Sequence, residues 1–442
     1  LMLSSVADRF SRLIRRYLPD AFVIAVLITL VVLLIGIVLN PTEPQVILQG
    51  WGDGFWTYLA FTMQMVLLLM TGMTLASVPF INRGLIRLAS LAKKPWQGYV
   101  LTFLVSASAY YINWGLAIVV GAIIAREIAK INHKTHFPLL VASAYSATVL
   151  FAGGMSSSVG LTIATEGHFL EEVMGVIPTS ETIFHPSTLI IFFSLVISIS
   201  IFLVLMSPKE NIKSYQSLIN GYEDKPKEKQ VGKKSDSPAL WLENTPTLGV
   251  IIGGIGIIYT VIAFIGGRDL DLDIINIFFL SLGLFLHRSL GQFVRAFGNV
   301  SKSISPIILQ FPFYAGIIGV LSSSGLGQII VDGMIAVAKP ENFNLLTYWL
   351  SGFINILAPS GGGQWALQGP LQIPAALELG VDPAKTAMAV AWGDAWTNLI
   401  QPFWALPILS VVGLHIRDIM GYCILLSLIV GIVTSILIFF LY

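Results

Sequence analysis

The chain has 442 residues, of which 55% are hydrophobic and only 11% are charged, and its mean hydropathy is +0.81. Soluble domains carry about a quarter charged residues, so the composition excludes an ordinary soluble protein and predicts one embedded in a lipid bilayer. The formal net charge of +1 argues against a nucleic-acid partner. With Cys423 as its single cysteine, the chain can form neither an internal disulfide nor a cysteine cluster.

Apolar runs separated by polar breaks follow one another along the whole chain. The first run, 21–39, is long enough to span a hydrocarbon core of about 30 Å. We therefore expect an all-α polytopic membrane protein. The runs cover residues 21–39, 55–80, 101–124, 137–164, 187–206, 247–265, 273–287, 304–323, 346–378, 385–411 and 420–441.

The positions of the 25 Lys and Arg residues predict which runs cross the bilayer. If 101–124 and 346–378 are re-entrant hairpins and the other runs cross, 22 of the 25 basic residues fall on one face. If every run crossed, the basic loops 81–100 and 125–136 would lie on opposite faces, against the positive-inside rule. We expect two hairpins, about nine crossings, the N-terminus inside and the C-terminus outside.

One polar stretch divides the chain. Residues 207–246 are rich in charges and poor in apolar side chains, which predicts a flexible cytoplasmic linker. The first half is then 1–206, the run 247–265 is an extra crossing helix, and the second half is 266–442.

The two halves share a pattern at an offset of about 241 to 248 residues. Their hairpins centre on 111–115 and 355–365, and about forty residues later each half has an apolar helix with a break, at 153–158 and 398–402. These breaks divide the predicted helices 137–164 and 385–411. Because 247–265 is an unpaired crossing, the second copy starts from the opposite face. Such an inverted repeat is typical of secondary transporters.

Interrupted helices at membrane depth are expected to line a binding site. Pro and Gly disfavour a helix interior, so we expect 359–363 to leave the helix and free its backbone groups. Helix N-termini at such breaks suit a carboxylate, whereas freed oxygens suit a cation. The alternative is that the glycines only permit close packing. The candidate substrate-binding residues are Asn113, Trp114, Gly115, Gly154, Ser156, Ser157, Ser158, Ser360, Gly361, Gly362, Gly363, Gln364, Gln401 and Pro402.

Asp394 is the acid most expected to have a function, because a carboxylate within the membrane is expensive. We expect it to help bind a coupling cation, either Na⁺ through oxygen ligands or a proton on the carboxylate. The alternative is a hydrogen-bonded structural aspartate near the outer interface. The candidate coupling-ion residues are Asn113, Ser360, Asp394, Thr397 and Asn398, and no other cofactor is expected.

The charge pattern also bears on the substrate. No Lys or Arg lies between residues 135 and 208, between 303 and 338, or between 386 and 416. This favours a small monocarboxylate, and a dicarboxylate or an amino-acid-derived anion is the alternative. A channel is disfavoured because channels commonly use rings of subunits. An intramembrane protease is disfavoured because His-Glu-x-x-His is absent and only Asp394 qualifies as an intramembrane aspartate, so no catalytic residue is expected.

Several motifs resemble those of the short-chain fatty acid transporter family of bacteria. They are residues 12–22, 50–56, 111–115, 359–365 and 392–398, and the likeness covers nearly the whole chain. The resemblance implies a member of the ion-transporter superfamily, with paired re-entrant hairpins, elevator-like motion and usually a homodimer. It also implies a symporter that imports butyrate- or acetoacetate-like acids across the inner (cytoplasmic) membrane. Substrate and ion would lie near Asn113, Ser156 to Ser158, Ser360 to Gln364, and Asp394 to Asn398.

Overall fold

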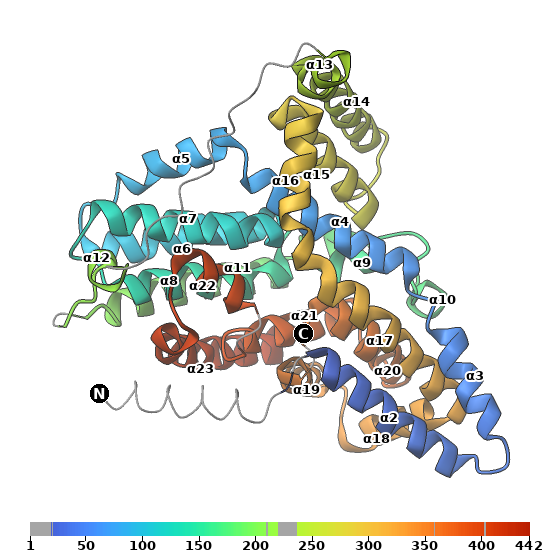
Figure 1. Ribbon diagram of the computed structural model, residues 1–442. Coiled ribbons are helices and arrows are strands. Elements are labelled where there is room, and N and C mark those ends of the chain that lie inside the picture. Colours follow the sequence, from blue (N-terminus) through green and yellow to red (C-terminus); the bar gives the residue numbers. More distant parts are fainter. Residues whose placement is uncertain (1–18, 20, 209–210, 220–236, 358, 402–403) are drawn as a thin grey trace.

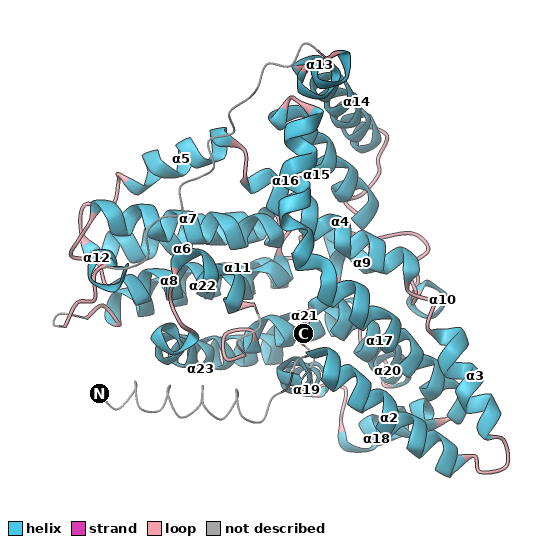
Figure 2. Cartoon of the chain, in the orientation of Figure 1, coloured by secondary structure: helices cyan, strands magenta, loops and turns pink. Residues whose placement is uncertain are grey.

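The computed structural model describes residues 19, 21–208, 211–219, 237–357, 359–401 and 404–442, and the regular elements of this part are helices (Figure 1; Figure 2). Many of them start at a proline, including α6, α11, α14 and α21, whose bounds follow. Proline suits the first helical turn because its fixed φ is already helical and no N–H is needed there.

The helices up to residue 208 are α2 (Ala21–Leu39), α3 (Pro44–Gly54), α4 (Leu59–Ala76), α5 (Pro79–Ala89), α6 (Pro95–Ile112), α7 (Trp114–Ile131), α8 (Phe137–Ser146), η1 (Ala147–Gly153), α9 (Gly160–Ile163), α10 (Glu171–Met174), η2 (Thr179–Glu181) and α11 (Pro186–Leu205). Those that follow are α12 (Tyr215–Ile219), α13 (Pro238–Asn244), α14 (Pro246–Ile265), α15 (Leu272–His287), α16 (Leu290–Val300), η3 (Ser301–Ile304), α17 (Ser305–Ser324), α18 (Leu326–Val337), α19 (Phe343–Leu357), α20 (Gly361–Glu378), α21 (Pro383–Thr397), α22 (Ala405–Val412) and α23 (Ile416–Leu441).

Two pairs of consecutive helices pack on each other in the regions where the sequence predicts re-entrant hairpins, and their re-entry into the membrane stays a prediction. Helices α6 and α7 pack on each other and are separated by Asn113 alone, while α19 and α20 pack on each other on either side of residues 358–360. The first hairpin is longer than the predicted 101–124, since it runs from Pro95 to Ile131. The predicted broken helices are also interrupted, between η1 and α9 and between α21 and α22.

The same order of elements occurs twice. Helices α4 and α5, a hairpin, an interrupted helix and α11 are matched by α17 and α18, a hairpin, an interrupted helix and α23. Ser360 follows Asn113 by 247 residues, and the two hairpin tips have the same backbone conformation, with φ and ψ of −159° and 123° at Asn113 and −158° and 109° at Ser360. Helices α7 and α20, which follow the tips, each have 18 residues.

The interrupted helices lie inside the molecule and the longest apolar helices lie outside. All residues of α8 and η1 are buried, whereas α14 exposes Ile251, Ile255, Ile258 and Ile262 among others. Within the described residues, six segments are long and apolar enough to cross a membrane: Phe22–Leu39, Pro44–Ala76, Pro186–Leu205, Pro246–Ile265, Leu290–Ser324 and Ile416–Leu441.

Two features of the second half differ from the sequence analysis. Gly361, Gly362 and Gly363 do not leave the helix but form the first turn of α20. Glycine weakens a helix interior, yet here Ser360 caps the helix and starts it ahead of the glycines. Helices α16 and α18 were not predicted, because α16 lies in the basic stretch between two apolar runs and the short apolar run of α18 follows closely on α17. Of the predicted linker, residues 211–219 include α12, which packs on α7, and residues 209–210 and 220–236 lie outside the described part.

Candidate functional site

The tip of the first hairpin is Asn113, a fully buried residue that caps α7. Its Oδ1 accepts a hydrogen bond from the Leu116 backbone N–H at 3.0 Å, and its Nδ2 donates to the Leu68 carbonyl of α4 at 3.2 Å. An N-cap asparagine satisfies an N–H group that a helix start otherwise leaves without a partner. The side chain therefore both starts α7 and fastens the tip to α4.

Two predicted glycines let other backbone segments approach this tip. A Cβ on Gly115 would lie 2.6 Å from the Leu69 carbonyl oxygen, and one on Gly154 would lie 2.8 Å from the Tyr111 carbonyl oxygen. The same Tyr111 oxygen accepts a hydrogen bond from the Met155 N–H at 2.6 Å. The break after η1 is thus held against the end of α6 by backbone contact, which a larger residue would prevent.

The three consecutive serines after that break have separate positions. Ser156 Oγ accepts a hydrogen bond from the Trp114 N–H at 3.0 Å and so joins the break to the hairpin tip. Ser157 Oγ accepts from the Gly160 N–H at 3.1 Å, at the start of α9. Ser158 instead lines the cavity described below.

Ser360 at the second hairpin tip is the N-cap of α20, as Asn113 is the N-cap of α7. Its Oγ accepts a hydrogen bond from the Gly363 N–H at 3.2 Å, which caps α20. The N–H groups of Gly361 and Gly362 belong to the first turn and have no acceptor within the helix. Both glycines line the cavity. A helix start of this kind, with a positive partial charge, is suited to hold a carboxylate.

A row of buried amides follows the tip along α20. Gln364 Nε2 donates to the Ser351 carbonyl of α19 at 2.8 Å and to Gln368 Oε1 at 3.1 Å. Gln368 continues to Gln372 at 3.2 Å, and Gln372 donates to Thr347 Oγ1 at 2.6 Å. The row ties α20 to α19, so the two arms of the hairpin form one unit. Gln364 Oε1 is buried and has no hydrogen-bond partner among the described residues.

Asp394 lies inside α21 with 1% of its surface exposed. A Cβ on Gly361 would lie 3.1 Å from its Oδ2, so the carboxylate faces the start of α20. Neither carboxylate oxygen has a hydrogen-bond partner among the described residues. Burying an isolated charge costs several kcal/mol. A proton or a cation on Asp394 would remove this cost, so the geometry favours the coupling-ion prediction over the hydrogen-bonded structural aspartate considered from sequence.

Asn355 of α19 was not among the predicted site residues, although it belongs to the centre of this site. Its Nδ2 donates to the Asp394 carbonyl at 2.8 Å, to Thr397 Oγ1 at 3.0 Å and to Asn398 Oδ1 at 2.9 Å. Its own Oδ1 is buried without a partner among the described residues. The available signal was an asparagine in an apolar run just before the Pro-Ser-Gly tip, because polar residues at membrane depth are expensive.

The second break is held by further polar contacts. Gln401 Nε2 donates to Asn398 Oδ1 at 3.1 Å, and the Tyr145 hydroxyl of α8 donates to the Asn398 carbonyl. Thr397 Oγ1 donates to the Gly352 carbonyl at 2.8 Å. Pro402, which was also predicted, lies outside the described residues.

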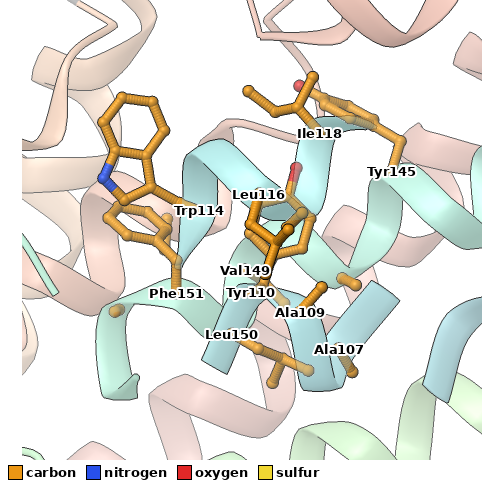
Figure 3. Packing of buried hydrophobic residues seen from close by; sticks show 14 of the residues in the cluster. Ala107, Ala109, Tyr110, Trp114, Leu116, Ile118, Tyr145, Val149, Leu150 and Phe151 are labelled. Atoms are coloured by element: carbon orange, nitrogen blue, oxygen red, sulfur yellow. The ribbon is translucent and has the colours of Figure 1, made fainter. Parts of the chain in front are cut away.

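The two hairpin tips and the two breaks meet at a small cavity. Its volume is about 40 Å³, and a cavity needs about 10–15 Å³ to hold one water molecule. Figure 3 shows four residues of its wall, Tyr110, Trp114, Ile118 and Phe151, within the buried apolar cluster. None of the described lining residues is charged. They are Met65, Tyr110, Trp114, Ile118, Thr148, Phe151, Ser158, Ile307, Phe311, Ser360, Gly361, Gly362, Asn398 and Trp404.

Nine of the predicted site residues have one of two roles. Trp114, Ser158, Ser360, Gly361, Gly362 and Asn398 line the cavity. Asn113, Ser156 and Ser157 instead hold the tip and the break through hydrogen bonds. A described part that is all-helical, with several apolar spans and a polar site at paired helix interruptions, is typical of a multi-pass membrane transporter.

The comparisons identify its family. Residues 2–441 match the model of the family described as short chain fatty acid transporter, and the chain belongs to this family. It is 39% identical over 434 residues to a candidate short-chain fatty acid transporter of Escherichia coli K12, with 98% of each chain covered. It is 39% identical over 431 residues to one of Haemophilus influenzae, with 96% of each covered. The prediction of a transporter rather than an enzyme is thereby confirmed.

Two solved structures share the fold. The Alcanivorax borkumensis YdaH transporter matches with a TM-score of 0.60 and 16% identity, over 95% of this chain and 98% of that one. Neisseria gonorrhoeae MtrF, described as one of a class of antimetabolite efflux pumps, matches with a TM-score of 0.51 and 15% identity, over 96% and 95%. At this identity the likeness concerns the fold alone.

Proposed function

We propose that the protein is a cation-coupled symporter that imports short-chain monocarboxylates such as butyrate and acetoacetate. The observation that carries the proposal is the juxtaposition of Asp394, buried without a partner among the described residues, and the start of α20, which borders a small cavity. The substrate carboxylate would accept hydrogen bonds from the N–H groups of Gly361 and Gly362. Its short apolar tail would lie against Trp114, Phe151 and Phe311, where each buried CH₂ contributes about 0.8 kcal/mol.

Asp394 supplies a physical reason for coupling. A substrate carboxylate at the start of α20 would lie close to the Asp394 carboxylate, and two like charges in a dry site repel each other. A proton or Na⁺ on Asp394 removes this repulsion, so ion and substrate would bind together. Asn355 Oδ1 and Gln364 Oε1, which have no partner among the described residues, are further candidate oxygens for a cation. Na⁺ and H⁺ both remain candidates.

The repeated order of elements supports alternating access. We propose that the halves form an inverted repeat, that α6–α7 and α19–α20 are re-entrant, and that N- and C-termini lie on opposite faces of the bacterial inner membrane. The hairpins and interrupted helices would move together past the peripheral helices, as in an elevator, within a homodimer. The dense polar ties between α19, α20 and α21 support movement as one body.

Competition for uptake tests the substrate class. Purified protein in proteoliposomes is given labelled butyrate with an excess of either acetoacetate or succinate. The absence of Lys and Arg from the described cavity lining favours a monoanion, so acetoacetate should suppress uptake and succinate should not. Stronger suppression by succinate, or by an acylated amino acid, would replace the proposal with the alternative of a dicarboxylate or amino-acid-derived substrate.

A further inference from the structure

A second and much larger cavity lies beside the first. Its volume is about 650 Å³, and the described residues of its wall come from α4, the segment 162–169 and α15. These elements lie towards the face that the basic residues predict to be outside. Polar groups in the wall include Gln64, Thr165 and Asn276. Asp273 in the same wall accepts a hydrogen bond from Gln64 at 2.8 Å and lies 4.0 Å from Arg268, which partly offsets its charge.

Two segments of the chain line both cavities, with residues that are only four positions apart. On α4, Met65 lines the small cavity and Phe61, four residues earlier, lines the large one. After the first break, Ser158 lines the small cavity and Thr162, four residues later, lines the large one. Four residues correspond to about 6 Å along a helix, so the partition between the two cavities is about one side chain thick.

Phe61 fills this partition. Its ring stacks on Phe311 of α17 with a centroid separation of 5.5 Å and meets Phe169 edge to face at 5.3 Å. It also touches the second hairpin tip, where a Cβ on Gly362 would lie 3.2 Å from Phe61 Cζ. The side chain is only 6% exposed although it borders the large cavity. Nearby, the Tyr58 hydroxyl donates to the Ala366 carbonyl of α20 at 2.8 Å.

We propose that Phe61 is the outer gate of the substrate site, and that the large cavity is the vestibule through which a small carboxylate reaches it. Because the ring rests on Gly362, movement of the hairpin tip changes the support of the gate. The gate thus opens and closes with the element that holds the substrate. This inference rests on the transport role proposed above, but it concerns the route rather than the substrate, and its test uses no substrate.

Cysteine accessibility tests the gate. Cys423 is replaced by Ser and a single reporter, Ser158→Cys, is placed in the small cavity. Intact cells are treated with a small, membrane-impermeant, cationic methanethiosulfonate, and the modification rate is measured with Phe61 or Phe61→Ala. We expect slow modification with Phe61 and a rate at least about tenfold higher with Phe61→Ala, which corresponds to about 1.4 kcal/mol in the opening equilibrium. Phe279→Ala, which removes another buried ring, on α15 and outside both described cavity walls, should leave the rate unchanged.

Two results would overturn the proposal. One is a rate that Phe61→Ala does not raise, and the other is modification with Phe61 present as fast as that of an exposed vestibule reporter, Glu166→Cys. Thr148→Cys, also in the small cavity, is the second reporter if Ser158→Cys does not fold. Failure of butyrate uptake combined with the expected accessibility pattern would discard the substrate and leave the gate in place.

Discussion

Gly72→Ala should loosen the first hairpin tip, because Asn113 packs directly on Gly72. A Cβ on Gly72 would lie 2.6 Å from Asn113 Cγ and 2.9 Å from Nδ2. Asn113 would have to swing away and give up its hydrogen bonds to Leu116 and Leu68. Losing the cap costs about 1 kcal/mol and stranding a buried partner about 1–3 kcal/mol. Alanine regains about 1 kcal/mol of helix propensity over glycine, so a net loss of about 1–3 kcal/mol is expected.

The assay is the apparent melting temperature of the purified protein, with butyrate uptake as the functional readout. The sign of the effect should depend on residue 113. With Asn113→Ala already in place the clash partner is gone, so Gly72→Ala should be neutral or stabilising. Gly84→Ala on α5, where a Cβ meets nothing within 4 Å, is the matched control. An equal loss in both backgrounds would refute the claim that Gly72 acts through Asn113.

Three further outcomes are expected. Asp394→Asn should abolish the response of butyrate uptake to an ion gradient while the protein stays folded, since an amide neither takes up a proton nor carries a charge. Ser360→Ala should lower stability by about 1 kcal/mol, whereas Ser360→Gly should cost only a few tenths, because glycine is itself a good N-cap. Burial, with Lys213 nearby, lowers the pKa of His136 to about 4. Its imidazole is therefore neutral in the folded protein at pH 7. The stability that it contributes is present above pH 6.5 and lost as the pH falls towards 4.

Each of these outcomes has a contrary result. Unchanged ion dependence in Asp394→Asn would remove its coupling role, and equal stability of the alanine and glycine variants of Ser360 would remove the capping role. For His136, which accepts a hydrogen bond from the Lys213 N–H at 3.1 Å, the comparison is with His136→Asn. The wild type should lose more melting temperature between pH 7 and pH 5 than the variant, and parallel losses would contradict the assignment.

The sequence predicts the hairpins and interruptions because their causes are local. Asn113 and Ser360 are good N-caps placed before long apolar runs, and glycine and serine clusters mark the first break. Helix bounds are less well predicted. The hairpin arms continue to Pro95 and Ile131, beyond the continuous apolar run, because Tyr99 near the start of α6 and Ile128 near the end of α7 are buried while their polar neighbours stay partly exposed.

The different roles of the individual site residues could not be predicted from the sequence. Ser156, Ser157 and Ser158 are chemically identical neighbours, and only the fold decides that two of them accept hydrogen bonds from backbone N–H groups while one lines the cavity. The sequence marks Asn355 only as a polar residue in an apolar run, because the partners that define its role lie 39 to 43 residues further along the chain. The role of Phe61 likewise depends on its contacts with α17 and with the second hairpin tip.

Uptake of labelled butyrate into proteoliposomes, under an inward Na⁺ gradient or an inward proton gradient in turn, tests the central claim most directly. We predict concentrative uptake under one of the two gradients and its loss when the gradient is collapsed. That result would establish coupled monocarboxylate transport and identify the ion that neutralises Asp394. Butyrate uptake that neither gradient changes, or the absence of butyrate uptake, would contradict the proposed coupling.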